Sequence, residues 1–342
     1  MQPTQTEVAT GSGTSKALTA PIDIGKEKAL SLKGQMLGEK HYTLLLDETG
    51  VVMTPDGQVL CVLLKNRLQP ELLEAVRPIV RKAARQPVAG GNRSEAAGTG
   101  NVQRTRKNRS PSKICGIPTL KDLSDEDYQR LKRAKSGVFG FNARTVRGGQ
   151  VYPCRLTAYS GVLPSELMLI SELAKEVSEA FRCSHVHDRW ETQFKKASQT
   201  PAFVLKTRDD LTPFTTVTCN QNWRVAAHVD QGDLKEGFGA MCCFGNFEGC
   251  DLVFPRYKVA VRYREGDVLL ADVANEVHGN TPLLNPDGTV PVPKSGEEPE
   301  RLACVFYYEE KMDQCLNSVE EEMEFVSTIN PGDPIYPKKK KS

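Results

Sequence analysis

The sequence lacks several features that would assign a protein to a class at once. Its 342 residues contain no hydrophobic run of about 18 residues and no charged segment followed by an apolar one at the amino terminus. We therefore expect neither a membrane span nor a secretory signal. None of the ten cysteines forms a C-x-x-C pair, which argues against a structural zinc site. Without a secretory signal, we expect all of the cysteines to be reduced thiols of an intracellular protein.

The balance of charge is nearly neutral and leaves the partner open. A formal net charge of +2 does not by itself favour nucleic acid, so such a partner has to be argued from local clusters of basic residues. Hydrophobic residues make up 39% and charged residues 26% of the chain, which allows a sizeable core in one large domain or two ordinary ones. Nothing in the sequence indicates an oligomer.

Three regions are distinguished by local composition. Residues 1–38 are rich in Thr, Ser, Gly and Lys with little periodicity, and we expect a flexible amino-terminal arm there. Residues 39–316 carry the periodic segments and are expected to form one domain, and residues 317–342 a carboxy-terminal tail. The final PKKKKS is either a nuclear signal or a solubilising tail. The expected compartment is the nucleus in a eukaryote and the cytoplasm in a bacterium or phage.

The first half of the domain contains both strands and helices. Two strands are expected within 41–66 around the turn TPDGQ, because Asp-Gly suits a tight reversal. Apolar residues at helical spacing predict a helix within 68–85, although Pro78 lies inside it. Similar patterns predict a longer amphipathic helix over 165–182 and a shorter one over 187–198.

Residues 86–113 form a long loop by composition. The loop has six basic side chains against one acid, Glu95, and connections of this length are usually functional or disordered. Two interpretations stay open: a solvated linker, or a loop that contacts the phosphates of nucleic acid together with Lys82 and Arg85. The basic side chains are Arg93, Arg104, Arg106, Lys107, Arg109 and Lys113.

From residue 201 onward the sequence consists of short β-rich runs separated by Gly, Asp, Asn and Pro. Such a series is typical of an antiparallel sandwich or jelly roll. With the helices that precede it, the series predicts an α+β protein with flanking helices. The runs are AFVLKT, FTTVTCN, WRVAAHVD, GAMCCFGNF, CDLVF, VAVRY, DVLLAD and LACVFYYEE.

One of these runs places His228 two residues before Asp230, so both side chains point to the same face of a strand and can reach one ion. H-x-D alone is weak support for a metal site. A third ligand is available in His278, 48 residues after Asp230, which suits a return across a jelly roll. Two imidazoles and one carboxylate are the facial triad of non-haem iron oxygenases, which leaves positions open for a bidentate co-substrate and dioxygen. Arg301 begins the last run and is placed to anchor the far carboxylate of a 2-oxo acid.

Other candidate ligands have a weaker context. His185, His187 and Asp188 lie on a polar stretch between two predicted helices, so we interpret them as surface residues. Asp267 precedes the apolar run VLLA and is expected in a turn. Asp272 follows the same run and could be mistaken for a ligand, but the spacing favours Asp230.

The segments WRVAAHVDQGD, CCFGNFEGCDLVFP, VRYREGDVLLADVANEVHGNTPL and RLACVFYYEE resemble the TET/JBP dioxygenases, which oxidise the methyl group of 5-methylcytosine or thymine in DNA. The resemblance covers about residues 40–312. It implies a double-stranded β-helix, Fe(II), 2-oxoglutarate and a base flipped out of the duplex. The positions that carry over are the metal ligands His228, Asp230 and His278 and the 2-oxoglutarate anchor Arg301.

The resemblance also implies further site residues. Arg224 lies near the position of a second co-substrate contact in related enzymes, and Asp233 matches a base-contacting Asp. Asp233 is otherwise interpreted as a turn residue after Gly232. Apart from the positions that carry over, Arg155 and Tyr159 are candidates for contact with the extruded nucleotide, with ordinary strand packing as the alternative.

The resulting hypothesis is a dioxygenase that oxidises the methyl group of 5-methylcytosine in DNA to 5-hydroxymethylcytosine and further. An acceptor such as Asp233 favours cytosine, which presents an amino donor where thymine presents a carbonyl. The alternative is the same iron chemistry on thymine, a protein side chain or a small molecule, and a third possibility is a non-catalytic jelly-roll binding module. The extent of oxidation, the sequence context and the choice between DNA and RNA are open at this point.

Overall fold

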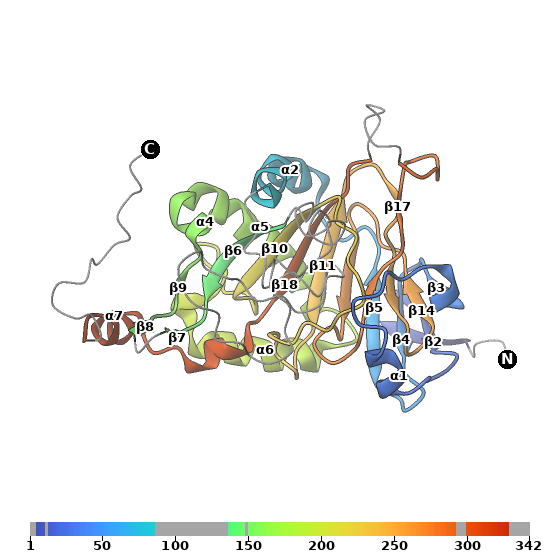
Figure 1. Cartoon of the computed structure of the whole chain (residues 1–342), viewed down its shortest axis with the longest axis horizontal. Coiled ribbons are helices and arrows are strands. Elements are labelled where there is room, and N and C mark those ends of the chain that lie inside the picture. Colours follow the sequence, from blue (N-terminus) through green and yellow to red (C-terminus); the bar gives the residue numbers. More distant parts are fainter. Residues whose placement is uncertain (1–4, 11–12, 86–135, 148–149, 292–298, 328–342) are drawn as a thin grey trace, which may run out of the picture.

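The large sheet of the computed structural model contains ten strands and forms the main wall of the molecule (Figure 1). The structure describes residues 5–10, 13–85, 136–147, 150–291 and 299–327. The order across the sheet is β1-β2-β4-β5-β15-β11-β18-β10-β6-β9. These strands are β1 (Gln5–Thr10), β2 (Gly13–Thr19), β4 (Gly50–Met53), β5 (Val59–Leu64), β15 (Val268–Ala271), β11 (Gly239–Phe244), β18 (Leu302–Tyr307), β10 (Thr216–Gln221), β6 (Ser136–Asn142) and β9 (Arg155–Leu156).

A smaller sheet has the order β16-β13-β14-β3. Its members are antiparallel except that β14 runs parallel to β3. Two large groups of strands, mostly antiparallel, agree with the predicted jelly-roll core of an α+β protein. The bounds are β3 (Leu44–Leu46), β13 (Leu252–Phe254), β14 (Val259–Val261) and β16 (Gly279–Asn280), with two further pairs, β7 (Thr145–Arg147) with β8 (Gln150–Tyr152) and β12 (Glu248–Gly249) with β17 (Leu283–Leu284).

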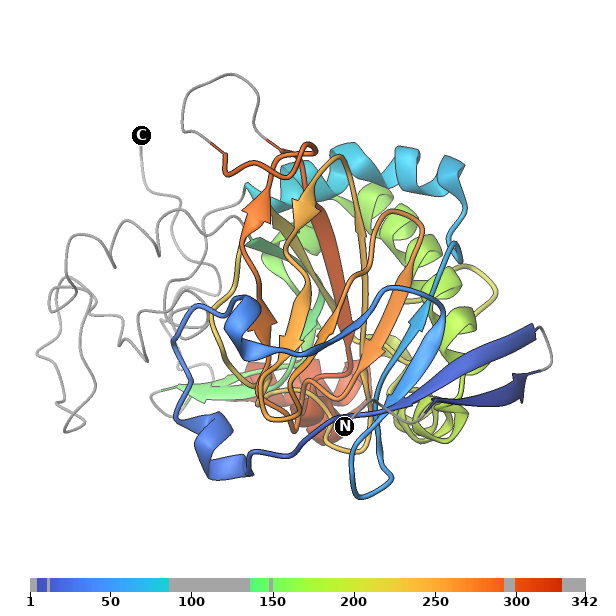
Figure 2. The same cartoon turned by 90° about the vertical axis from the view of Figure 1, so that its right-hand side faces the viewer.

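Two long helices cover the outer face of the large sheet. Figure 2 shows α2 in cyan and α5 in green lying together against that face. Their apolar side chains share one core with β10, β11, β15 and β18. Within the described ranges, no helix combines the length and the apolar character needed to cross a bilayer. The helical elements are α1 (Lys26–Leu30), η1 (Glu39–His41), α2 (Pro70–Ala84), α4 (Ala158–Val162), α5 (Pro164–Arg182), α6 (His187–Gln199), η3 (Pro201–Phe203), η4 (Glu310–Gln314) and α7 (Ser318–Ser327).

The inner face of the same strands is more polar because side chains alternate along a strand. On β10, Val217 and Cys219 join the core under the helices, whereas Thr218 and Asn220 line a cavity on the opposite face. The same alternation on β18 sends Leu302, Cys304 and Phe306 to the core and its intervening residues to the cavity. The sheet therefore supplies a packed outer face and a polar inner face from one set of strands.

The amino-terminal segment departs from the expected flexible arm. Strand β2 pairs in parallel with β4, and Leu18, Ala29 and Leu37 are at most 3% exposed. Gly34 N–H donates a backbone hydrogen bond of 2.8 Å to the carbonyl oxygen of Ala227, and Ala227 N–H donates one of 2.8 Å to that of Gln35. The expectation failed because these apolar residues are widely spaced and show no period. Each of them nevertheless packs into a hydrophobic core cluster of the domain. The division into three regions stays a prediction.

Most predicted elements are confirmed. The hairpin around TPDGQ and the helices over 68–85, 165–182 and 187–198 appear as β4–β5, α2, α5 and α6. The predicted strand over 202–207 is wrong, because Pro201 begins the short helix η3 and only Lys206 makes an isolated bridge, to Leu211. The segment WRVAAHVD is not a regular strand either, and His228 pairs with His278 in a single bridge. The basic loop 86–113 lies outside the described residues.

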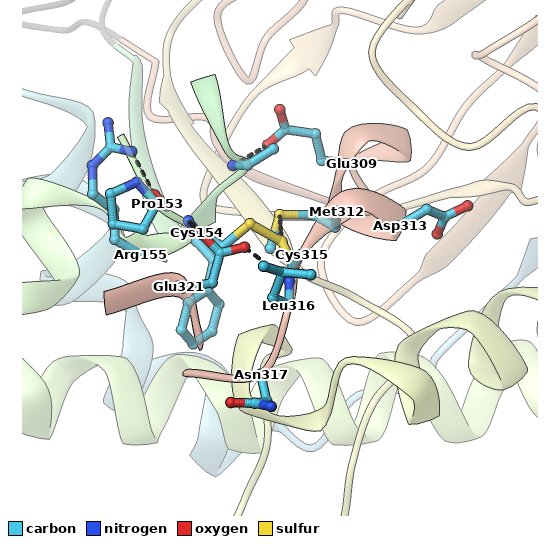
Figure 3. The surroundings of a disulfide bond; sticks show 12 residues. Pro153, Cys154, Arg155, Glu309, Met312, Asp313, Cys315, Leu316, Asn317 and Glu321 are labelled. Atoms are coloured by element: carbon cyan, nitrogen blue, oxygen red, sulfur yellow. Dashed lines mark hydrogen bonds between the residues drawn. A yellow bond between two sulfur atoms is a disulfide. The ribbon is translucent and has the colours of Figure 1, made fainter. Parts of the chain in front are cut away.

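A disulfide joins Cys154, between β8 and β9, to Cys315, just after η4 (Figure 3). The two Cα atoms are 5.8 Å apart although 161 positions separate the residues in the sequence. The prediction that all cysteines are reduced is therefore wrong for this pair. No local motif marks it, because only the fold brings the two residues together. The other described cysteines, Cys61, Cys183, Cys219, Cys242, Cys243, Cys250 and Cys304, are free, and Cys115 lies outside the described residues.

The region expected as a tail begins with helix α7, which is attached to this disulfide. Glu321 is 2% exposed, and its carboxylate accepts hydrogen bonds from the N–H groups of Cys154 at 2.9 Å and Leu316 at 2.8 Å (Figure 3). Within the acidic run EEEMEF, the single carboxylate of Glu321 therefore binds the backbone of both segments that the disulfide joins. The first turns of the expected tail are part of the folded unit.

Candidate active site

His228, Asp230 and His278 converge on the inner side of the large sheet. Asp230 Oδ1 lies 3.5 Å from His228 Nε2, and Asp230 Oδ2 lies 3.5 Å from His278 Nε2. One ligand atom from each residue lies within 4.8 Å of the other two. Two imidazole nitrogens and a carboxylate oxygen at this separation form a donor set that suits a divalent iron ion.

The two histidines are oriented by the backbone. Nδ1 of His228 lies 2.8 Å from the carbonyl oxygen of Ala226, and Nδ1 of His278 lies 3.1 Å from that of Glu276. Both contacts direct Nε2 toward Asp230, in the way that outer contacts orient metal-bound imidazoles. His228 and His278 also exchange two backbone hydrogen bonds, each of 2.9 Å.

Gly279 allows these two segments to come so close. A Cβ atom at this position would lie 3.0 Å from the carbonyl carbon of Ala226 and from the nitrogen of Ala227. Any side chain would push β16 away from the segment that carries His228. The glycine therefore preserves the distance between the two imidazoles.

Asp230 remains charged in this environment. Burial raises its pKa, but the hydrogen bonds and charges of His228 and His278 outweigh burial and hold the pKa well below its usual value. A carboxylate that stays ionised across the physiological pH range is what a metal ligand requires.

The triad lines a cavity of about 870 Å³ that also contains Arg301. Arg301 is 4% exposed, donates a 2.7 Å hydrogen bond to the hydroxyl of Tyr263, and has no partner for Nε among the described residues. A buried guanidinium with an unused donor is expected to pair with an anion. The predicted position of Arg301 therefore fits an anchor for the carboxylate of 2-oxoglutarate.

Asp233 and Glu309 line the same cavity at the end of β18 opposite Arg301, and this part of the cavity is called the mouth. The two residues pair in a single β-bridge, and Asp233 is 8% exposed. Burial raises the pKa of Glu309, which accepts a 3.4 Å hydrogen bond from the N–H of Ala143. Two neighbouring carboxyl groups at the mouth can supply one acceptor and, when one of them is protonated, one donor.

Two predicted site residues do not line the cavity. Arg224 donates from Nε to the carbonyl oxygen of Asn280 at 3.3 Å and from its terminal nitrogen to that of Leu37. Its guanidinium therefore holds the amino-terminal segment, and the structure does not support the expected co-substrate contact. Arg155 donates to the carbonyl oxygen of Pro153 at 2.8 Å (Figure 3). Tyr159, named with it, does line the cavity.

The competing ligand candidates lie elsewhere. His187 and Asp188 are exposed at the start of α6, and His187 stacks on Trp190 with ring centroids 5.6 Å apart. Asp267 accepts hydrogen bonds from Lys65 and from the backbone of Asn66 and Arg264, as expected of a turn residue. Asp272 bonds Asn275 and does not line the cavity.

Several cavity residues were missed from the sequence, among them Tyr263, Asn220, Ser136 and Glu309. Tyr263 continues the alternation of Val259 and Val261 by two residues, and this period was the one signal available. Ser136 and Glu309 have no local signal, since their position depends on which strands are neighbours in the sheet.

Comparison with known proteins identifies the domain. The Tet_JBP family, described as the oxygenase domain of the 2OGFeDO superfamily, matches residues 170–310. Thymine dioxygenase JBP1 of Leishmania major is 34% identical over 297 residues, which cover 86% of this chain and 30% of that protein. The bifunctional helicase and thymine dioxygenase JBP2 of Leishmania infantum is 47% identical over 77 residues, which cover 22% of this chain and 7% of that protein.

These relatives are therefore much longer than the part that this chain matches. Among solved structures, NgTET1 in complex with 5mC DNA is similar with a TM-score of 0.47 and 14% identity, covering 90% of this chain and all of that one. The superfamily uses Fe(II) and 2-oxoglutarate, as expected from the residues. On the family match and the likeness to JBP1, the chain belongs to the Tet/JBP family of 2-oxoglutarate- and Fe(II)-dependent oxygenases.

Proposed function

We propose that this domain oxidises the C5 methyl group of 5-methylcytosine in DNA. The observation that carries the proposal is a single cavity lined by His228, Asp230, His278 and Arg301 together with Asp233. Bound Fe(II) and 2-oxoglutarate would supply the oxidising chemistry that a methyl C–H bond requires. The chain's own residues hold these groups, admit the base and keep the methyl group directed inward.

The residues that line the cavity have separate roles in this proposal. His228, Asp230 and His278 would hold the metal, and Arg301 would hold the distal carboxylate of 2-oxoglutarate. Arg301 and His278 are at most 4% exposed, so charges placed there are screened little by water. This favours a tightly held dianionic co-substrate.

A base inside a duplex cannot reach a metal at this depth and has to be extruded. The mouth offers Tyr307 and Tyr159 as aromatic surfaces and Asp233 as a hydrogen-bonding group. The basic loop 86–113 would contact phosphates on either side of the extruded nucleotide, and this part of the proposal rests on sequence alone.

Asp233 favours 5-methylcytosine over thymine. A carboxylate accepts a hydrogen bond from the exocyclic amino group of cytosine, whereas it opposes the O4 carbonyl of thymine. Opposing two buried acceptors costs about 1–3 kcal/mol. The base read beside an ionised Asp233 is therefore 5-methylcytosine.

Thymine is the second candidate, and two observations favour it. The relatives JBP1 and JBP2 are thymine dioxygenases by name. Burial raises the pKa of Glu309, and a protonated Glu309 beside Asp233 would offer a donor to O4 while Asp233 accepts from N3–H. The order of donor and acceptor at the mouth decides between the two bases.

The test uses two duplexes that differ at one position, 5-methylcytosine in one and thymine in the other. Each is incubated with the protein, Fe(II) and 2-oxoglutarate, and the nucleosides are measured by mass spectrometry. We expect 5-hydroxymethylcytosine to form faster than 5-hydroxymethyluracil. A faster reaction on thymine would establish the second candidate, and no oxidised nucleoside from either duplex would reject DNA as the substrate.

A further inference from the structure

Two buried polar side chains that line the cavity, Ser136 and Asn220, have unused hydrogen-bonding atoms. Ser136 is 4% exposed and Asn220 is 9% exposed. Among the described residues, neither Ser136 Oγ nor Asn220 Oδ1 has a hydrogen-bond partner. Buried polar atoms are nearly always paired, so such an atom in a binding cavity indicates a missing ligand or water.

The register places these residues in one row with the co-substrate end of the cavity. Asn220 on β10 pairs with Ser136 on β6 and, on its other side, with Ala303 on β18. All three line the cavity, and directly opposite residues on one face have Cβ atoms about 4.5–5.5 Å apart. The methyl group of Ala303 leaves the space above Asn220 open toward Arg301.

Position along β18 distinguishes the two ligands that could fill this space. Ala303 lies two residues from Arg301 along β18, or about 7 Å, and six residues from Glu309, or about 20 Å. Asn220 is therefore beside the anchor of the co-substrate and far from the carboxyl groups that would read the base. An amide can rotate to present its NH₂ group to a carboxylate, which leaves Oδ1 to accept from a hydroxyl.

We propose that Asn220 binds the 2-oxo acid co-substrate through its side-chain NH₂ group, and that Ser136 fixes the orientation of this amide by donating from Oγ to Oδ1. Asn220 is then a second co-substrate contact, on the β10 side of Arg301, with Tyr263 on the other side. Ser136 is a positioning residue that acts through Asn220. The proposal rests on the proposed function, because it takes 2-oxoglutarate as the ligand.

The experiment measures binding rather than turnover. Affinity for 2-oxoglutarate is determined by calorimetry with Mn²⁺ in place of iron, and the affinity for Mn²⁺ alone is measured separately. Asn220→Ala should weaken 2-oxoglutarate binding about tenfold, the loss expected when one hydrogen bond to a charged group is removed, and leave Mn²⁺ affinity unchanged. Asn142→Ala is the matched control, since it removes the same amide at the mouth end of β6 and should not alter 2-oxoglutarate affinity.

Ser136→Ala tests the positioning role and also serves if Asn220→Ala fails to fold. It should weaken 2-oxoglutarate binding by less than Asn220→Ala, and the double variant should bind no more weakly than Asn220→Ala alone. Additive losses would show that Ser136 does not act through Asn220 and would overturn that part.

The two proposals fail in different ways. If wild-type protein with Mn²⁺ does not bind 2-oxoglutarate, the proposed function fails. If wild type binds it and Asn220→Ala binds it equally well, the inference about Asn220 is wrong while the proposed function stands. A variant that binds 2-oxoglutarate normally but has a raised KM for DNA would assign Asn220 to the base instead.

Discussion

The deep end and the mouth of the cavity are built in different ways. At the deep end, which holds the metal ligands and Arg301, His278 and Arg301 are each 4% exposed. Arg301 adjoins β18, which pairs with β10 and β11 along several residues. At the mouth, Asp233 and Glu309 meet through an isolated bridge between segments outside the regular strands. The sheet therefore holds Arg301, whereas His228 with His278 and Asp233 with Glu309 meet through single bridges. The mouth differs from the metal ligands in lying beside the disulfide.

This difference separates the common chemistry from the choice of substrate. Metal and co-substrate need fixed groups. The sheet fixes Arg301, and the backbone contacts of both Nδ1 atoms fix the imidazoles of His228 and His278. Reading a base needs donors and acceptors that can be changed without disturbing that frame, and segments outside the strands allow this. Substitutions at the deep end should therefore abolish the reaction, while those at the mouth should change which base is oxidised.

The largest effect is expected from a metal ligand. His278→Ala removes one of three ligands from the deep end, so turnover should fall below detection and metal affinity should drop strongly while the fold is retained. Metal content after dialysis and product formation are measured. His187→Ala, which changes an exposed histidine on α6, should behave as wild type. Wild-type activity in the His278 variant would remove the assigned metal site.

A smaller loss is expected when the co-substrate anchor is removed. Arg301→Ala deletes a charge-assisted contact worth about 1.5–3 kcal/mol, so the KM for 2-oxoglutarate should rise by about 10- to 150-fold. Arg224→Ala is the matched control, because that guanidinium binds the carbonyl groups of Leu37 and Asn280. It should lower the melting temperature without raising this KM. The reverse pattern would exchange the roles of the two arginines.

The sequence predicted the deep end better than the mouth, for a physical reason. The two-residue spacing of His228 and Asp230 and the apolar runs beside His278 and Arg301 were sufficient, although the segment of His228 is not a regular strand. Asp233 could be named, but its neighbour Glu309 is 76 positions away and meets it through a bridge that no local pattern encodes. The same holds for Cys154 with Cys315, and for the isolated apolar residues that attach the amino-terminal segment.

At the mouth, Asp233→Ala should change selectivity more than chemistry. The kcat/KM for oxidation of 5-methylcytosine should fall by a factor that corresponds to about 1–3 kcal/mol, because the amino group of the base loses its acceptor. Decarboxylation of 2-oxoglutarate without base oxidation should continue, since the deep end is unchanged. The two products are measured in the same reaction. Equal oxidation by variant and wild type would leave Asp233 as a turn residue only.

The smallest effect on turnover is expected from the disulfide. Replacing Cys154 and Cys315 by Ser removes a cross-link that closes a long loop, which should lower the free energy of unfolding by about 2–4 kcal/mol. Cys315 follows η4, which follows Glu309, so the variant should also loosen the mouth and raise the KM for DNA more than the KM for 2-oxoglutarate. Cys183→Ser, at an exposed free cysteine, is the control and should alter neither.

The free energy of unfolding and the two KM values are also measured for wild-type protein in a dithiol reductant. The reduced protein should behave like the double variant. The two KM values should separate, because a general loss of stability would affect both ligands equally through the fraction of folded protein. If the double variant raises the two KM values equally, or raises only that for 2-oxoglutarate, the disulfide does not support the mouth in particular. If thiol labelling of unreduced protein modifies Cys154 and Cys315, the cross-link is absent in solution and its stability contribution with it.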